Sequence, residues 1–101
     1  MILEVARILV RAGQADVFEA MSRQAQATIA GVPGYLAHEF QRRVEREGEY
    51  LLLVRWRTLA DHRVGFRGSS EYQRWKALLH HFHDPFPAVS HYEAVAGTPG
   101  A

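Results

Sequence analysis

The sequence predicts an α+β domain in which a four-stranded antiparallel sheet carries helices on one face. The first observation behind this prediction is that stretches of period-two alternation and stretches of helical periodicity follow one another in the order β-α-β-β-α-β. The second is that the whole pattern fits into 101 residues, which is enough for one domain and too few for two.

The first strand is predicted over residues 2–11 and is largely apolar on both faces. One face holds Ile2, Glu4, Ala6, Ile8 and Val10, and the other holds Leu3, Val5, Arg7 and Leu9. Strands of this kind are usually covered on both sides. Ala12 and Gly13 then break the strand.

A helix is predicted from about Asp16 to Ala30, where the apolar residues recur with helical spacing. Its apolar stripe consists of Val17, Phe18, Met21, Ala25, Thr28 and Ile29. No Ser or Thr caps its start, whereas Gly31 and the Pro33-Gly34 pair end it.

Two further strands are predicted over 35–44 and 49–57, joined by the polar, glycine-containing loop 45–48. In the earlier strand, one face holds Leu36, His38, Phe40, Arg42 and Val44. The later strand has Tyr50, Leu52, Val54 and Trp56 on one face and Leu51, Leu53, Arg55 and Arg57 on the other. Because its signal is the strongest in the chain, we expect it to be central in the sheet.

The second helix is predicted in two parts. Thr58 and Asp61 resemble a capping box that begins a short helix over about 59–65, and the run from Ser70 to Gln73 is a better one for a helix over about 70–82. The apolar stripe of the longer part is Tyr72, Trp75, Leu78, Leu79 and Phe82. Pro85 and Pro87 end it, and a less regular strand over 89–96 precedes a tail over 97–101.

This order is the ferredoxin-like βαββαβ arrangement, with the second helix split and residues 1–96 forming the domain. Since helices can cover only one face of the sheet, a set of apolar side chains would lie in water on the other face. These are Leu3, Val5, Leu9, Leu51 and Leu53, or their counterparts on the opposite face. A second copy packed sheet to sheet would cover them, so we predict a homodimer that forms a dimeric α+β barrel.

The composition excludes several classes of protein. Twelve Lys and Arg against eleven Asp and Glu give a net charge of +1, too little to attract a phosphate backbone, so no nucleic-acid partner is expected. The absence of Cys excludes disulfides, thiolate nucleophiles and cysteine-based metal sites. The longest apolar run, Tyr50 to Val54, is far short of a membrane span, and Glu4 and Arg7 interrupt the N-terminal apolar stretch. We expect a cytoplasmic domain with no membrane partner.

Several motifs carry a resemblance to a known family. They are the run from Tyr50 to His62, Gly65-Phe66-Arg67, the run from Ser69 to Tyr72, Trp75, and the closing run from Asp84 to Tyr92. On these residues the chain resembles the antibiotic biosynthesis monooxygenase (ABM) domain family, within the dimeric α+β barrel superfamily, over about residues 1–95. The resemblance identifies the fold better than it identifies a reaction, because the superfamily hosts many activities.

The resemblance implies an oxygenase that uses neither metal nor flavin, so no cofactor is expected. It also implies a pocket between the sheet and the helices of each subunit, and a polycyclic phenol, anthrone or quinol as the typical substrate. Such chemistry needs a base, a cation or donor for the developing oxyanion, and a dry aromatic slot. Some relatives use an Asn side chain in the pocket, and this chain contains no Asn.

Each candidate site residue also has a purely structural interpretation. His62 matches the histidine of the family's short helix and could act as a base, or it could be an inert surface or capping histidine. Trp56 could stack on an aromatic substrate or only pack against the helices. Tyr72 and Trp75 belong to a stripe that forms core more often than pocket, and Phe66 could line the same slot.

The remaining histidines point less clearly to a site. The run from His80 to Asp84, with His91 beyond it, invites a metal-site interpretation. However, neighbouring helix positions diverge by about 100°, and His80 and His81 are both expected to point away from the apolar stripe. No metal site is therefore expected. His38 and His91 fall on the predicted edge strands, where either could face a pocket or the dimer seam.

The leading hypothesis is a cofactor-independent monooxygenase that uses O₂ on a small aromatic, anthrone or quinol-type substrate. Trp56, Phe66, Tyr72 and Trp75 would bind the substrate, and His62 would be the acid–base group. One alternative is a non-catalytic dimer that binds a ligand or serves a stress or regulatory role. The other is a haem-degrading enzyme of the same superfamily. Relatives of that kind depend on an Asn, which is missing here, and Trp75 lies near the expected ligand position.

Overall fold

The computed structural model describes residues 1–82 and 87–97 and has the predicted α+β, ferredoxin-like architecture. Its strands are β1 (Ile2–Leu9), β2 (Tyr35–Arg42), β3 (Glu49–Trp56) and β4 (Val89–Tyr92). They form one antiparallel sheet in the order β2-β3-β1-β4, so β3 lies inside the sheet as predicted and β2 and β4 are its edges.

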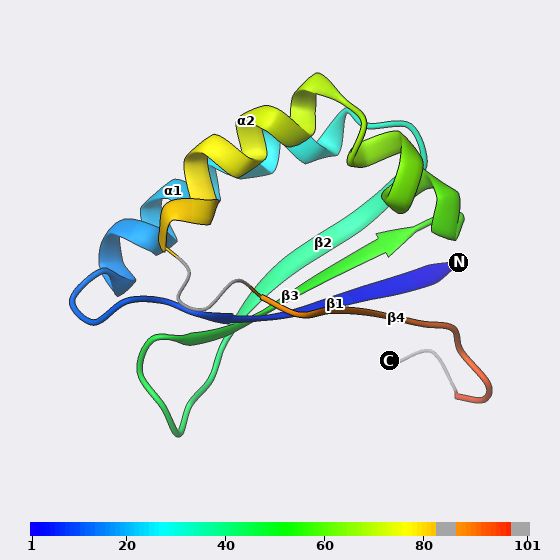
Figure 1. The fold of residues 1–101 in the computed structure, drawn as a ribbon. Coiled ribbons are helices and arrows are strands. Elements are labelled where there is room, and N and C mark those ends of the chain that lie inside the picture. Colours follow the sequence, from blue (N-terminus) through cyan, green and yellow to red (C-terminus); the bar gives the residue numbers. More distant parts are fainter. Residues whose placement is uncertain (83–86, 98–101) are drawn as a thin grey trace.

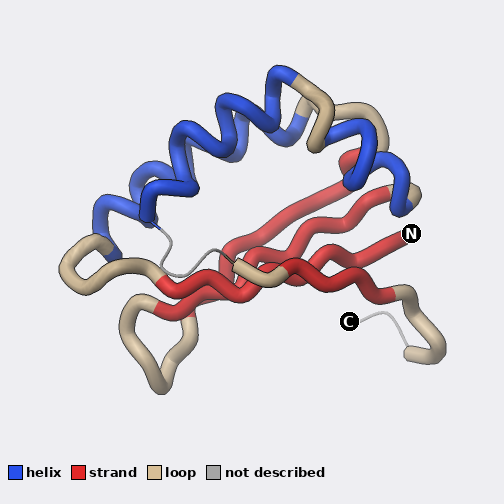
Figure 2. The backbone as a smooth tube through the Cα atoms, in the orientation of Figure 1, coloured by secondary structure: helices blue, strands red, loops and turns tan. Residues whose placement is uncertain are grey.

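Both long helices lie on the same side of the sheet. Helices α1 (Ala15–Ala30) and α2 (Ser70–Leu79) run side by side above it, and no described helix covers the opposite face (Figures 1 and 2). A short π-helix, η1 (Asp61–Phe66), precedes α2, and a 3₁₀ turn, η2 (His80–Phe82), follows it. The second helix is therefore split, as the two capping signals predict.

The core lies between the sheet and the two helices. Pairing of β1 with β3 along their full length places one set of side chains toward the helices. On this side the buried apolar residues of the strands are Ala6, Ile8, Tyr50, Leu52, Val54 and Trp56. The helical layer adds Phe18, Ala25, Ile29, Phe66, Trp75, Leu79 and Phe82. Both predicted apolar stripes thus face the sheet, with Val17 at the margin of its stripe and half exposed.

The opposite face of the sheet carries apolar side chains among a few charged ones and lies open in the single chain. Leu3, Val5, Leu9 and Leu53 are only partly buried, and Leu51 is 38% exposed. Arg7 lies on the same face, and its guanidinium donates to the Glu49 carboxylate at 3.1 and 3.2 Å, which makes a structural ion pair. The apolar face that motivates the predicted dimer is therefore present.

The structure corrects three local predictions. A β-bulge between Tyr35 and Ala37 puts Tyr35 on the helix side with His38, and Leu36 is left 49% exposed instead of sharing that face. Helix α2 is capped by Ser69, whose hydroxyl accepts from the N–H of Tyr72 at 3.1 Å, and not by Ser70.

The third correction concerns length: β4 ends at Tyr92, short of the predicted residue 96. His83, Asp84 and the tail residues 98–101 lie outside the described residues.

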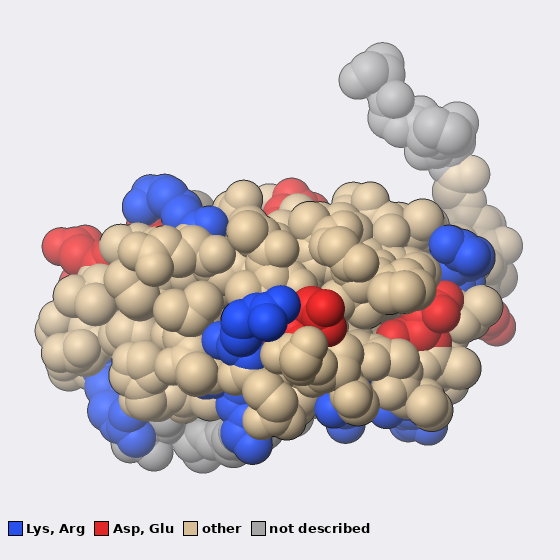
Figure 3. Space-filling model, turned by 90° about the horizontal axis from the view of Figure 1, so that it is seen from above, with Lys and Arg blue, Asp and Glu red and all other residues tan. Residues whose placement is uncertain are grey.

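The surface is mixed in character. Seen from the helix side, basic and acidic side chains are scattered among uncharged ones (Figure 3). Within the described residues, neither helix combines the length and the hydrophobicity needed to cross a bilayer.

Candidate active site

A small cavity lies between the helix-facing side of β1 and the layer formed by η1 and α2. Its volume is about 50 Å³. The sheet contributes Glu4, Ala6 and Ile8 from β1 and Leu52 from β3 to its lining. The helical layer contributes His62 and Phe66 from η1, then Arg67, and Tyr72, Trp75 and Leu79 from α2, followed by His80. The cavity thus has mostly apolar and aromatic walls with a few ionisable groups among them.

The carboxylate in this cavity belongs to Glu4. The strict alternation of β1 turns Glu4 to the helix side with Ala6 and Ile8, and only 5% of the residue is exposed. The indole Nε1–H of Trp56 donates to its Oε1 at 2.9 Å. Burial raises the pKa of Glu4, while the Trp56 hydrogen bond and the charge of Arg67 act in the opposite direction.

The imidazole beside this carboxylate belongs to His62. At the start of the short helix, the Thr58 N–H donates to Asp61 at 3.1 Å and the Asp61 N–H donates back to the Thr58 hydroxyl at 3.2 Å, as the capping box predicts. The next residue, His62, then lies over the sheet. It is 2% exposed, and its Nε2 is 3.3 Å from Oε1 of Glu4.

His62 is held as a neutral ring. It stacks on Trp56 with ring centroids 5.4 Å apart. Burial, together with the positive charge of Arg67, lowers the pKa of His62 to about 3. Its second nitrogen, Nδ1, lies 2.7 Å from Nε2 of His91 on β4. Both ring nitrogens of His62 therefore have partners, and the residue is buried and not on the surface.

The structure brings the five predicted site residues into one cluster. Phe66 packs on Trp56 with centroids 5.4 Å apart, on Tyr72 at 5.2 Å and on Trp75 at 6.0 Å. Phe66, Tyr72, Trp75 and His62 line the cavity. Trp56 is fully buried behind His62 and reaches the site through its hydrogen bond to Glu4.

Sequence reasoning missed three members of the site. The signal that could have identified Glu4 is its position as an isolated acidic residue on an otherwise apolar strand face. Arg67 lines the cavity directly after η1. His80 also lines the cavity, contrary to the expectation that it points away from the apolar stripe, because the chain tightens to a 3₁₀ turn there.

A metal-holding arrangement is not seen in the described part of the chain. Among residues 1–82 and 87–97, no group of three or more His, Asp and Glu side chains is placed to hold a metal ion. His81 is exposed, and His38 lies on the helix side with its Nδ1 2.6 Å from the Tyr35 hydroxyl.

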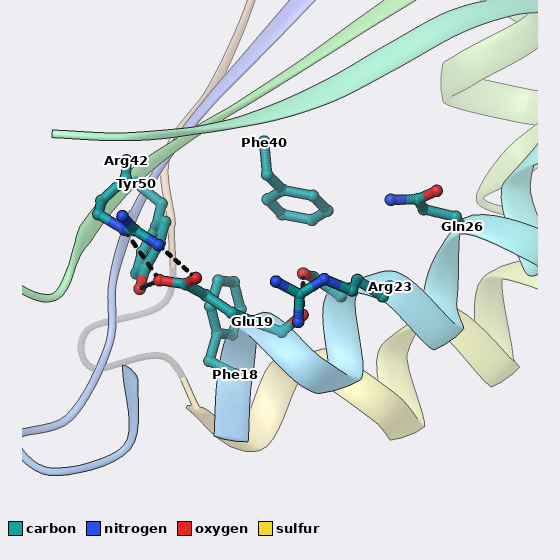
Figure 4. Close-up of a pocket in the computed structure, with 8 residues that line it drawn as sticks. Phe18, Glu19, Arg23, Gln26, Phe40, Arg42 and Tyr50 are labelled. Atoms are coloured by element: carbon teal, nitrogen blue, oxygen red, sulfur yellow. Dashed lines mark hydrogen bonds and ion pairs between the residues drawn. The ribbon is translucent and has the colours of Figure 1, made fainter. Parts of the chain in front are cut away.

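A larger groove of about 200 Å³ lies elsewhere, between α1 and strands β2 and β3 (Figure 4). Phe40 hangs into it from β2, and Glu19 projects from α1 (Figure 4). Both oxygens of Glu19 are occupied, since Arg42 donates to them and the Tyr50 hydroxyl donates to Oε2 at 2.6 Å. This groove is wider than the Glu4–His62 cavity, but its carboxylate links α1 to the sheet and offers no free base.

Comparison with known proteins places the chain in a family. The model of the family described as "Antibiotic biosynthesis monooxygenase" matches residues 1–78. The uncharacterized protein YczJ of Bacillus subtilis (strain 168) is 50% identical over 95 residues, which cover 94% of this chain and 100% of that protein.

Solved structures support the same family assignment and the same fold. A Bordetella bronchiseptica protein whose crystal structure carries the same family name is 34% identical, with a TM-score of 0.90 and coverage of 94% of this chain and 97% of that one. SnoaB from Streptomyces nogalater, a cofactor-independent oxygenase, shares the fold at 18% identity, with a TM-score of 0.83 and coverage of 98% and 97%. The chain therefore belongs to the antibiotic biosynthesis monooxygenase family.

Proposed function

We propose that this protein is a cofactor-independent monooxygenase that uses O₂ to oxidise a small aromatic, anthrone or quinol-type substrate. The observation that supports it best is the buried Glu4–His62 pair, which faces a cavity with aromatic walls. A carboxylate held away from water beside a neutral imidazole is a competent base for an acidic C–H or phenolic O–H group.

The proposed reaction begins with proton removal at the cavity. Glu4 accepts the acidic proton of the substrate with His62 beside it as the acid–base partner, and Arg67 at the cavity wall stabilises the resulting anion. The electron-rich anion passes one electron to O₂, and the two radicals combine to form a C–O bond. The peroxide then takes up a proton, loses water and leaves a carbonyl group, so one oxygen atom enters the product and the other leaves as water.

The aromatic residues have two roles in this proposal. Phe66, Tyr72 and Trp75 form the slot for the substrate ring, while Trp56 holds Glu4 and His62 in place. The cavity of about 50 Å³ is smaller than the roughly 150 Å³ that benzene occupies in an apolar cavity, so side chains must separate on binding. Tyr72, which is only partly buried, is the side chain proposed to move.

The small cavity also favours a second candidate, a non-catalytic dimer that binds a ligand or serves a regulatory role. Such a protein would need no base, and the buried pair would then be structural. Haem degradation is not supported, because the chain has no Asn, on which such relatives depend.

Oxygen uptake tests the proposal. Chelator-treated protein is offered a panel of anthrones and hydroquinones, with boiled protein as the blank. Wild type is expected to consume O₂ with at least one substrate, and His62→Gln is expected to lose roughly 10²-fold or more of that rate. His81→Gln changes an exposed histidine outside the cavity and serves as the matched control. No uptake by wild type across the panel would favour the non-catalytic alternative.

The oligomeric state and the location belong to the same proposal. We propose a homodimer in which the open sheet faces of two copies pack together as a dimeric α+β barrel, which covers Leu3, Val5, Leu9, Leu51 and Leu53. The cytoplasm is the proposed location.

A further inference from the structure

We propose that His91 is the outer member of a proton relay, Glu4–His62–His91, that connects the cavity with solvent at the β4 edge of the sheet. This inference rests on the proposed function, because it supplies the route by which protons reach and leave the cavity. It assigns a role to a histidine that does not line the cavity.

The three groups form a continuous chain of contacts. Oε1 of Glu4 lies 3.3 Å from Nε2 of His62, and Nδ1 of His62 lies 2.7 Å from Nε2 of His91. The second link is short for a nitrogen pair, and the first is slightly longer than a usual N–H···O hydrogen bond. The two nitrogens of His62 therefore face the two ends of the chain, as a relaying imidazole requires.

The topology of the sheet explains why the chain leads outward. Glu4 and His91 are direct partners in the β1–β4 pairing, so both side chains project on the helix side, and His62 bridges them from η1. Strand β1 is internal, which buries Glu4, whereas β4 is an edge strand. His91 is consequently only partly buried, and the chain runs from the cavity to the rim of the molecule.

One proton moves along this chain from Glu4 to water in three transfers. The O–H of protonated Glu4 breaks as N–H forms at Nε2 of His62. The Nδ1–H of His62 breaks as N–H forms at Nε2 of His91, and the Nδ1–H of His91 passes to water. In the product state Glu4 is ionised and accepts a hydrogen bond from the Nε2–H of His62. The Nδ1 of His62 in turn accepts a hydrogen bond from the Nε2–H of His91. The reverse sequence brings a proton in from water for the peroxide step.

Burial and the neighbouring arginines disfavour a positive charge on the two imidazoles of the relay. Arg63 of η1 and Arg67, which follows it, act on both imidazoles, and Glu4 is the acidic group that faces His62 from β1. Burial, followed by these arginines, holds the pKa of His91 below its ordinary value, as it does that of His62. A positive charge on either ring is therefore disfavoured.

Substitution of His91 tests the relay. His91→Gln keeps an N–H that can donate to His62 but cannot pass a proton on. With a substrate that wild type oxidises, kcat is expected to fall by roughly 10–100-fold with KM little changed. In His91→Ala, added imidazole is expected to restore the rate, while His81→Gln should behave as wild type. An unchanged kcat in His91→Gln, or no rescue of His91→Ala by imidazole, would overturn the relay and leave the proposed function standing.

A second measurement needs no substrate. In ¹⁵N-labelled wild type, the proton shared between His62 and His91 should give a downfield NMR signal that exchanges with water, and in His91→Gln the His62 ring proton should exchange more slowly. Equal exchange rates in the two proteins would contradict the relay even if no substrate is ever oxidised. If exchange slows but wild type consumes no O₂, the relay stands and the proposed function fails.

Discussion

His62 is 2% exposed, and a positive charge on its ring would lie beside Arg67 and away from water. Burial, first, and these neighbouring charges, second, hold its pKa at about 3, compared with 6.5 for the ordinary group. A group whose pKa is lower in the folded state than in the unfolded state contributes stability at pH values above its unfolded pKa. That stability is lost as the pH falls from 6.5 toward 3.

Replacing His62 should therefore change how stability depends on pH. Between about pH 7.5 and about pH 5, wild type should lose about 2 kcal/mol of unfolding free energy relative to His62→Gln, because only wild type has this ring to protonate on unfolding. Urea unfolding followed by tryptophan fluorescence measures the difference, with His81→Gln as the exposed-histidine control. Parallel pH curves for wild type and His62→Gln would show that the ring is not held neutral.

Arg67 acts on the site through its charge. It lies at the cavity wall and lowers the pKa of both His62 and Glu4. In Arg67→Gln both pKa values should rise, so the acidic limb of the pH profile of kcat/KM should move to higher pH, and KM for substrates that form an anion should increase. Arg74→Gln, on the outer surface of α2, is the control. A limb that stays in place or moves to lower pH would contradict the assigned role.

At the scale of elements, the turn before β2 fixes the position of η1. Gly34 has φ +85°, and a Cβ added there would lie 2.1 Å from Cγ of Asp61, the residue that closes the cap of η1. Gly34→Ala should therefore destabilise the protein by about 1–3 kcal/mol through backbone strain and this clash. Gly31→Ala has open space around it and an ordinary φ, so it should be nearly neutral. Equal thermal midpoints for the two variants would refute this account of the turn.

The start of α2 allows two neighbouring serines to be compared. The Ser69 hydroxyl accepts from the Tyr72 N–H, whereas the Ser70 hydroxyl donates to Glu71 on the surface at 3.3 Å. Ser69→Ala should lower the unfolding free energy by about 1 kcal/mol, and Ser70→Ala should change it by less than about half of that. Urea titrations of the two variants would decide, and a larger loss for Ser70→Ala would reverse the assignment.

Local patterns account for the elements better than for the site. Alternation in β3 and the Thr58–Asp61 cap are each encoded within a few residues, and both are found as predicted. No residue type in the strand marks the β2 bulge, so alternation alone assigns Leu36 to the face of His38 and Phe40, whereas the residue is 49% exposed. The Glu4–Trp56 bond joins residues 52 apart and depends on strand register, which a periodicity argument cannot supply.

For the whole molecule, β1 connects the site with the proposed dimer face. Its alternation turns Glu4 toward the helices and its neighbours Leu3 and Val5 toward the open face. A partner that covers the open face would therefore pack directly against the strand that carries the carboxylate. Dimer formation and the geometry of the site are then linked through a single strand, so a substitution on one face of β1 should alter the packing on the other face.

A charge placed in the open face should separate the dimer. Leu53 lies between Val5 of β1 and Glu39 of β2 in the middle of that face, where the larger, charged side chain of an arginine would replace apolar contacts with the partner. Light scattering at micromolar concentration should give twice the chain mass of 11.5 kDa for wild type and the single mass for Leu53→Arg. Val64→Arg changes a residue that is 72% exposed on η1 and should remain dimeric. A wild-type protein of single mass would refute the dimer, and a dimeric Leu53→Arg would place the interface on another face.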